Sequence, residues 1–275
     1  MDISAKDVMK LKDITSAGVM DCKKALIETN GNFDEALKVL KEKGLADTKK
    51  RLDRETKEGG VFVALKDNKV VIILLGCETD FVSGNDIFKS GKDKILSRAL
   101  ETLSESTDTY LDLVQDISVQ TKEKIDLKAI KCITLNPNQK VKTYIHGNNR
   151  IGVVVIFDIA INIKDSQYFE EMSNNIAMHI AASNPLYLEP SQIPEKDINE
   201  QKEIFTKQLE GSNKPQNVID NIVKGKLEKY YGETCLVNQP YVKDDKVSVS
   251  QYIETISKKI VCDVKINSFI RYMIG

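Results

Sequence analysis

Few side chains of this sequence stand in a pattern that supports catalysis. Asp80 follows the longest apolar run, residues 70–76, and could serve as a general base. It has no second carboxylate at a working spacing, and an aspartate after a strand is more often a turn or cap residue. His179 lies in the apolar stretch IAMHIAAS, where a histidine is more often a packed or capped core residue than a catalyst. An active site built on either residue is therefore not expected.

The sequence contains no motif for binding a nucleotide or hydrolysing a substrate. The phosphate-binding pattern G-x-x-x-x-G-K-[ST] is absent, and no G-x-G-x-x-G follows a predicted strand. The patterns H-E-x-x-H and G-x-S-x-G are absent as well, and the chain has only two histidines. We therefore expect a protein that is not an enzyme, with no catalytic residue, no cofactor and no GTP of its own.

The cysteines are spread singly along the chain and form no metal-binding pattern. No C-x-x-C pair occurs, and no histidine stands at ligand spacing from a cysteine. This usage predicts reduced thiols in a cytoplasmic protein and no metal site. The five are Cys22, Cys77, Cys132, Cys235 and Cys262.

The charges are balanced, with 40 Lys and Arg residues against 41 Asp and Glu residues. No basic excess would draw the whole molecule to nucleic acid or to an anionic membrane. The first residues, MDISAKDVMKLKD, carry charges where a secretory signal needs an apolar core, and no apolar run approaches the length of a membrane span. We therefore expect a soluble protein without a direct nucleic-acid or membrane partner, whose partner is a protein or a small molecule.

Apolar residues at helical spacing predict three short helices near the N-terminus. A turn at Asn30-Gly31 should separate the second helix from the third, and Gly44 should end the third. The stretch ADTKKRLDRETKEGG that follows has almost no apolar side chain and therefore no reason to pack into a core. The prediction is a three-helix domain at residues 1–45 and a charged linker at residues 46–60.

Beyond residue 60 the helical pattern gives way to β-rich runs, and one order of elements occurs twice. That order is a hairpin, two helices and a strand. In the first half the elements are expected at residues 61–65, 70–77, 87–103, 119–125 and 130–135; in the second half they are expected at 141–146, 151–161, 168–182, 249–260 and 264–273. Two halves related by internal repetition, at residues 61–140 and 141–275, give an α+β fold.

A charged segment at about residues 185–230 interrupts the second half. It begins with three spaced prolines and breaks again at the sequence GSNKP. Helical spacing on both sides of that break predicts an inserted antiparallel helical hairpin. The expected seam consists of Ile198, Ile204, Phe205 and Leu209 on one arm and Val218, Ile222, Val223 and Leu227 on the other.

Several blocks of this sequence match those of a known family, in that family's order. The blocks are VMDCKKALIETNGNFDEALKVLKEKG, CETDFV, HGNNRIGVVV, IAMHIAAS, GKLEKYYGETCLVNQPYV and FIRYMIG. Together they resemble the bacterial translation elongation factor Ts family over nearly the entire chain. The first block is similar to the ubiquitin-associated-like N-terminal domain of the family, and CETDFV is similar to its Thr-Asp-Phe-Val signature, which follows a strand.

The resemblance implies a guanine nucleotide exchange factor that promotes GDP release from elongation factor Tu during translation elongation. In the family, an Asp-Phe pair inserts between helices of the GTP-binding domain and disturbs the Mg²⁺ and phosphate side of the site. That role carries over to Thr79, Asp80, Phe81 and Val82. Other partner contacts carry over to Met20, Cys22, Lys23, Ile125, His146 and Gly147. A homodimer or a heterotetramer with the GTPase is an assembly that the resemblance allows.

These assignments have alternatives. Phe81 would fill the protein's own core if it behaved as an isolated aromatic residue after a strand. His146 would be an exposed hairpin residue, and Lys23 would belong to a solvated helix face. Asp126, next to Ile125, stands where close relatives have glycine, and it adds a side chain and a charge. As a whole, the chain could instead be a ubiquitin-associated-type module fused to an unrelated domain, or an enzyme with an unrecognised site.

Overall fold

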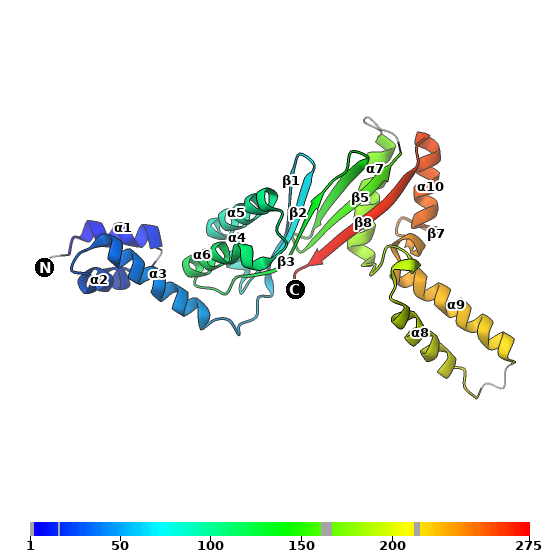
Figure 1. The fold of residues 1–275 in the computed structure, drawn as a ribbon, viewed down its shortest axis with the longest axis horizontal. Helices are drawn as coiled ribbons and strands as arrows, with labels where there is room; N and C mark the ends of the chain where they lie inside the picture. Colours follow the sequence, from blue (N-terminus) through cyan, green and yellow to red (C-terminus); the bar gives the residue numbers. More distant parts are fainter. Residues whose placement is uncertain (1–2, 16, 161–166, 212–214) are drawn as a thin grey trace. The chain divides into compact units, whose positions relative to one another are not determined.

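The structure, a computed structural model, describes residues 3–15, 17–160, 167–211 and 215–275. Helices and sheets are both present, so the predicted α+β class is confirmed (Figure 1). The chain divides into two compact units. The first unit is Met1–Thr134, Ile145–Gly152 and Tyr272–Gly275, and the second is Leu135–Tyr144 and Val153–Arg271.

Three helices open the first unit, as predicted: α1 (Ala5–Thr15), α2 (Val19–Glu28) and α3 (Phe33–Lys49). Their shared apolar core contains Leu11, Cys22, Leu26, Ala36 and Leu40, among others. Helix α3 begins at the N-cap Asn32, whose side chain accepts hydrogen bonds from the backbone N–H groups of Asp34 and Glu35. The helix satisfies its first donors in this way.

The expected end of the third helix at Gly44 is wrong, because α3 continues to Lys49. A glycine inside a helix costs about 1 kcal/mol relative to alanine. At this position it serves close packing, since a Cβ on Gly44 would lie 2.7 Å from Cγ1 of Val119. Gly44, whose residue type indicated a helix end, therefore lies inside α3 and packs closely against Val119.

The residues after α3 also differ from the expectation that the charged stretch has no reason to pack. The Nζ atom of Lys124 donates to the carbonyl oxygens of Leu52 (2.6 Å) and Arg54 (2.8 Å). The Arg54 guanidinium forms an ion pair with Glu78 at 3.1 Å, and Lys128 donates to the Thr56 carbonyl. Polar bonds to the backbone hold this stretch, which hydropathy alone does not predict.

A three-stranded antiparallel sheet follows, in the order β1-β2-β3, with β1 at Glu58–Lys66, β2 at Lys69–Cys77 and β3 at Asp126–Thr134. The predicted hairpin is confirmed: Leu65 pairs with Val70, and Asp67 in the turn has a φ of 55°. Helices α4 (Asp80–Gly84), α5 (Asp86–Thr102) and α6 (Leu111–Thr121), with a short 3₁₀ turn at Thr107–Tyr110, cover one face of this sheet (Figure 1).

The helix expected at residues 119–125 lies earlier in the chain, at α6 (Leu111–Thr121). It buries Val114 and Ile117 against the sheet and ends where Lys122 adopts a left-handed conformation, with a φ of 60°. Residues 123–125 are therefore the connection to β3. A left-handed cap ended this helix although the residue in it is not glycine.

A second sheet consists of β4 (Gln139–His146), β5 (Ile151–Ile159) and β8 (Val264–Met273), in the order β4-β5-β8; most of its residues belong to the second unit, and the strand ends within 145–152 and 272–275 belong to the first. Helices α7 (Gln167–Ser183) and α10 (Val249–Ile260) pack against each other. A small hairpin is formed by β6 (Pro240–Tyr241) and β7 (Asp244–Ser248). The predicted order of elements is confirmed, and the end expected for the second strand, Ile161, lies outside the described residues.

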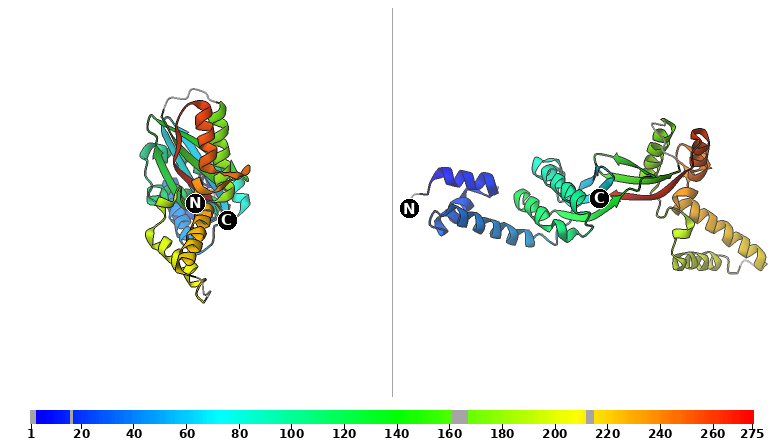
Figure 2. Two further views of the ribbon diagram at one scale, coloured as in Figure 1. Left: turned by 90° about the vertical axis from the view of Figure 1, so that its right-hand side faces the viewer. Right: turned by 45° about the horizontal axis from the view of Figure 1, so that its top comes forward.

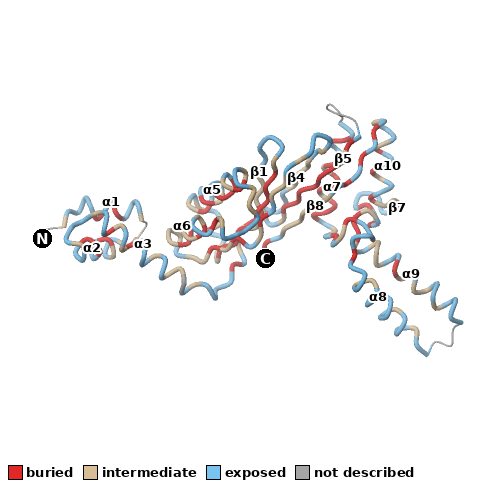
Figure 3. The backbone as a smooth tube through the Cα atoms, viewed as in Figure 1, coloured by how far each residue is buried: buried red, intermediate tan, exposed pale blue. Residues whose placement is uncertain are grey.

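The insert is a helical hairpin, as predicted, with α8 at Glu195–Lys207 and α9 at Gln216–Thr234 (Figure 2). Short 3₁₀ turns flank it at Pro190–Gln192 and Leu236–Asn238. Its seam is thin, because Leu227 is the buried residue of α9 while Ile204 and Val218 are exposed. Most of the backbone of both helices is coloured as exposed or intermediate (Figure 3). Lys226 supports it by donating to the Gln208 side chain and lying over the Phe205 ring.

Candidate functional site

The segment Thr79–Val82 joins strand β2 to helix α4. Strand β2 ends at Cys77, and Thr79 is the N-cap of α4, with its Oγ1 atom accepting from the Val82 backbone N–H at 3.4 Å. Ser83 closes the short helix by donating its hydroxyl to the Asp80 carbonyl at 2.8 Å. A rigid strand and a capped helix therefore define the position of Asp80 and Phe81.

Side chains of this segment point in opposite directions. Val82 is buried in the apolar cluster under the sheet, whereas Asp80 is exposed and Phe81 is 86% exposed. Phe88, seven residues later in α5, is fully buried, and its ring packs edge-on against the Phe62 ring with 6.2 Å between the ring centroids. The alternative in which Phe81 fills the protein's own core is therefore excluded.

Two carboxylates hold the backbone of this segment. The Glu123 carboxylate accepts the backbone N–H groups of Glu78 and Thr79, both at 3.0 Å, and the Thr79 hydroxyl at 2.6 Å. The Glu78 carboxylate accepts the Lys124 backbone N–H at 2.6 Å and pairs with Arg54. Sequence reasoning missed Glu78, Glu123 and Arg54, because nothing in their spacing marks them as neighbours.

The thiol of Cys77 lies beneath the same segment. Burial first, and then the negative charges of Glu123 and Glu58, raise the pKa of this thiol to about 12. Cys77 therefore stays protonated at neutral pH, and its Sγ–H donates to the Thr79 carbonyl at 3.1 Å. It acts as a small buried donor and not as a nucleophile.

One pocket of about 490 Å³ in the first unit brings Asp80 and Gly147 together. Gly147 belongs to the turn between β4 and β5, in which Gly147, Asn148 and Asn149 all have positive φ angles. The Val61 backbone N–H donates to the Asn149 carbonyl at 2.8 Å and fixes this turn to β1. The remaining lining residues are Glu58, Gly59, Phe62, Ser83, Gly84, Lys89, Asn148, Asn149 and Arg150.

The other predicted contact residues differ in exposure. Met20 is 65% exposed, and Lys23, His146 and Gly147 are exposed as well. Cys22 is fully buried in the three-helix core, with its Sγ atom 3.9 Å from the Ala17 carbonyl, and Ile125 is buried under the first sheet. Cys22 and Ile125 can therefore shape the surface, but neither presents its side chain to a partner.

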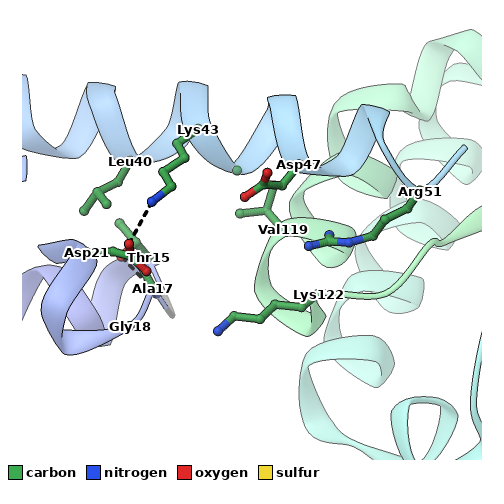
Figure 4. A pocket seen from close by; sticks show the side chains of 11 residues that line it. Thr15, Ala17, Gly18, Asp21, Leu40, Lys43, Asp47, Arg51, Val119 and Lys122 are labelled. Atoms are coloured by element: carbon green, nitrogen blue, oxygen red, sulfur yellow. Dashed lines mark hydrogen bonds and ion pairs between the residues drawn. The ribbon is translucent and has the colours of Figure 1, made fainter.

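A second pocket, between α3 and the ends of α2 and α6, has five charged residues among the eleven that line it (Figure 4). Asp21 and Lys43 form an ion pair of 2.7 Å across it. The hydrogen bond from Lys43 lowers the pKa of the Asp21 carboxyl, and the same bond raises the pKa of Lys43. Asp47, Arg51 and Lys122 line the pocket as well, so its wall carries three basic and two acidic side chains.

His179 is a core histidine, as predicted. Its Nδ1 atom accepts the Val242 backbone N–H at 3.2 Å, so the proton resides on Nε2, which donates to the Gln239 side-chain oxygen at 2.9 Å. Burial lowers the pKa of the imidazole, and the bond to Gln239 opposes that shift in part. The ring is thus neutral, fully buried and occupied on both nitrogens.

Across the described ranges, no three His, Cys, Asp or Glu side chains are grouped so that they could hold a metal ion. Within the same ranges, no helix has the length and apolar character needed to cross a membrane. Cys22, Cys77, Cys132 and Cys235 form no disulfide. Among the described large apolar residues of the first unit, Phe81 has the highest exposed fraction.

Comparison with known proteins identifies the family. The family model described as "Elongation factor TS" matches residues 78–275. The chain is 39% identical to elongation factor Ts of Borrelia hermsii over 279 aligned residues, which cover 100% of both chains. It is 40% identical to elongation factor Ts of Halothermothrix orenii, covering 100% of this chain and 93% of that protein. It is 36% identical to elongation factor Ts of Treponema denticola, covering 100% of this chain and 99% of that protein.

These relatives align along the full length of the sequence, and the family model spans both the Thr79–Val82 segment and the second unit. The chain therefore belongs to the elongation factor Ts family.

Proposed function

We propose that this protein is the guanine nucleotide exchange factor of elongation factor Tu and that Asp80 and Phe81 form the wedge that promotes GDP release. The observation that carries the proposal is the 86% exposure of Phe81 on a segment whose backbone is held by Glu123 and Glu78. Single exposed apolar residues are common on protein surfaces, so the exposure of Phe81 supports the proposal together with two other features: the held backbone beneath the ring and its place in the family's Thr-Asp-Phe-Val signature.

Exchange requires differential binding and no covalent chemistry. A GTPase holds its nucleotide through backbone amides, a lysine and a Mg²⁺ ion that bridges the phosphate oxygens. A protein that binds the empty GTPase more tightly than the loaded form weakens nucleotide binding by the same factor. The chain therefore needs no catalytic residue and no cofactor of its own, and we propose that it is not an enzyme.

In this mechanism the four residues of the segment have different tasks. Phe81 enters the GTPase beside its Mg²⁺ site, and Asp80 adds a negative charge next to the ring. Val82 anchors the segment in the core, and Thr79 caps helix α4. The hydrogen bonds of Thr79 to Glu123 and to the Val82 backbone hold the position from which the ring would act as a wedge.

Further contacts would extend the interface beyond the wedge. Met20 and Lys23 offer an exposed apolar and cationic surface on α2, and His146 with Gly147 lies on the turn that shares a pocket with Asp80. We place the protein in the cytoplasm, where its GTPase partner acts. For assembly, a homodimer or a heterotetramer with the GTPase would use the thin-seamed α8–α9 hairpin, and sedimentation of a variant lacking that hairpin tests this assignment.

The decisive measurement is release of labelled GDP from the cognate elongation factor Tu. At saturating concentrations of this protein, release should accelerate by orders of magnitude, whereas the protein alone should bind and hydrolyse no GTP. An unchanged release rate at saturation would refute the assignment. Hydrolysis by the purified chain alone would instead favour an enzyme.

A further inference from the structure

The conformation of the Thr79–Val82 segment depends on a side chain from another part of the chain. Glu123 stands in the connection after α6, 44 residues beyond Thr79 in sequence. Its carboxylate receives three hydrogen bonds from the two residues that precede Asp80. Hydrogen bonds to an ionised acceptor are about twice as strong as bonds between neutral groups.

The bond to the Thr79 hydroxyl decides how the helix is capped. A hydroxyl has one hydrogen, and at 2.6 Å that hydrogen is directed to the Glu123 Oε1 atom. The lone pairs of the Thr79 oxygen are then left for the Val82 backbone N–H. Glu123 thus selects the one hydroxyl orientation that starts α4 at Asp80, and with it the direction in which Phe81 leaves the surface.

Glu123 is itself held in place. Its carbonyl accepts the hydroxyl of Ser118, which is almost fully buried, and its backbone N–H donates to Thr121 Oγ1 at 3.4 Å. The left-handed Lys122 turns the chain directly before it. The carboxylate therefore approaches Thr79 from a fixed backbone and not from a free loop.

From this geometry we infer that Glu123 is a positioning residue of the exchange reaction: it holds Thr79 so that Phe81 is presented to the GTPase in a single orientation. The inference rests on the proposed function for its effect on exchange. Its structural part, the ordering of residue 81 in the free protein, can be tested without any partner.

The partner-free test uses the absence of tryptophan from this sequence. A Phe81→Trp variant carries one indole at the tip of the wedge, so its fluorescence anisotropy reports the local motion of that side chain together with the tumbling of the molecule, which all the variants share. Adding Glu123→Ala should lower the anisotropy, and adding Glu123→Gln, which retains one acceptor oxygen, should restore part of the loss. Glu101→Ala removes an exposed carboxylate from α5 and should leave the anisotropy unchanged. Unchanged anisotropy in both Glu123 variants would overturn the inference.

The second test measures GDP release from elongation factor Tu against the concentration of the exchange factor. Glu123→Ala, with Phe81 retained, should lower the maximal release rate by about tenfold, while the half-saturating concentration changes by less than about threefold. Glu123→Gln should recover part of that rate, and Glu101→Ala should match the unmodified protein. A general loss of folding would instead raise the apparent half-saturating concentration and leave the maximal release rate unchanged, because more total protein is then needed to supply the same folded concentration.

A double variant shows whether Glu123 acts through the wedge. If it does, Phe81→Ala with Glu123→Ala should exchange no more slowly than Phe81→Ala alone, because the second change has nothing left to position. Additive losses would contradict the inference. If the unmodified protein does not accelerate release at all, the proposed function fails, whereas normal exchange by Glu123→Ala refutes only the positioning role.

Discussion

Replacing Phe81 with alanine separates partner recognition from folding. About one-seventh of this residue is covered in the free protein, since it is 86% exposed. A phenylalanine buries about 150–250 Å² when fully enclosed, so the change removes roughly 30 Å² of contact, which at about 25 cal/mol per Å² is worth ~0.7 kcal/mol. The free energy of unfolding should therefore fall by less than about 1 kcal/mol.

Phe88 is the matched control, because it is also a phenylalanine of the α4–α5 region but is fully buried. Truncating a buried phenylalanine costs about 3–5 kcal/mol. Phe88→Ala should therefore lower the midpoint of urea unfolding strongly, whereas Phe81→Ala should move it little. Leu111→Ala, at an exposed apolar residue of α6, controls for the loss of surface contact in general.

Exchange should show the opposite order. An aromatic residue at the centre of an interface contributes roughly 2 kcal/mol or more, so Phe81→Ala should slow stimulated GDP release by about 30-fold or more. Leu111→Ala should release GDP at the normal rate. A Phe81→Ala protein that unfolds early, and whose folded fraction exchanges normally, would refute both the surface position of Phe81 and its role as a wedge.

Four further substitutions test close packing, helix propensity, backbone strain and the buried histidine. Gly91→Ala should destabilise the first unit by about 1–3 kcal/mol, because the new Cβ would lie 2.3 Å from Ile117. Gly225→Ala, at an open position in α9, should stabilise the protein by about 0.5–1 kcal/mol. Urea unfolding measures both changes. Val261→Gly should stabilise by about 1 kcal/mol, because this exposed valine has a φ of 52°; a lower melting temperature would contradict this. The lowered pKa of His179 means that the unfolded chain binds the proton more tightly, so the free energy of unfolding should fall as the pH drops below about 6.5, and His179→Gln should flatten that dependence.

Elements with a strong local signal could be predicted from the sequence. The helix at residues 249–260 and the strand at 264–273 have the predicted bounds, because a Ser248–Gln251 capping box starts α10 and alternation marks β8. The range predicted for helix α6 extended too far along the chain, because the residue that ends the helix, Lys122, is not of a type that favours a left-handed cap. Gly44 misled for the converse reason, since its small size serves a tertiary contact.

Some features of the candidate site could be predicted from the sequence, and others could not. Taken alone, an aromatic residue after a strand favours a core position for Phe81, and the exposed position was expected only from the family resemblance; the structure has Asp80 and Phe81 exposed. Whether a residue of a matching block faces outward depends on tertiary packing, so the burial of Cys22 could not be read from the block that contains it. Glu123 could not be predicted at all, because its contact with Thr79 is made in space across 44 residues of chain.

The hydrogen bonds from Lys124 to the carbonyls of Leu52 and Arg54 affect how the first unit would bind its partner under the proposed function. A free chain of the length of residues 46–60 would span roughly 20 Å on average and would give the three-helix segment and the wedge an effective concentration governed by chain statistics. Instead, α3 ends at Lys49, and three residues later the Leu52 carbonyl accepts a hydrogen bond from Lys124. Only a few backbone bonds between the three-helix segment and the wedge can then rotate. If the spacing of these two elements matches the spacing of their binding sites on the partner, the second contact adds affinity without a large entropic cost. If the spacings differ, the short connection cannot adjust to the difference.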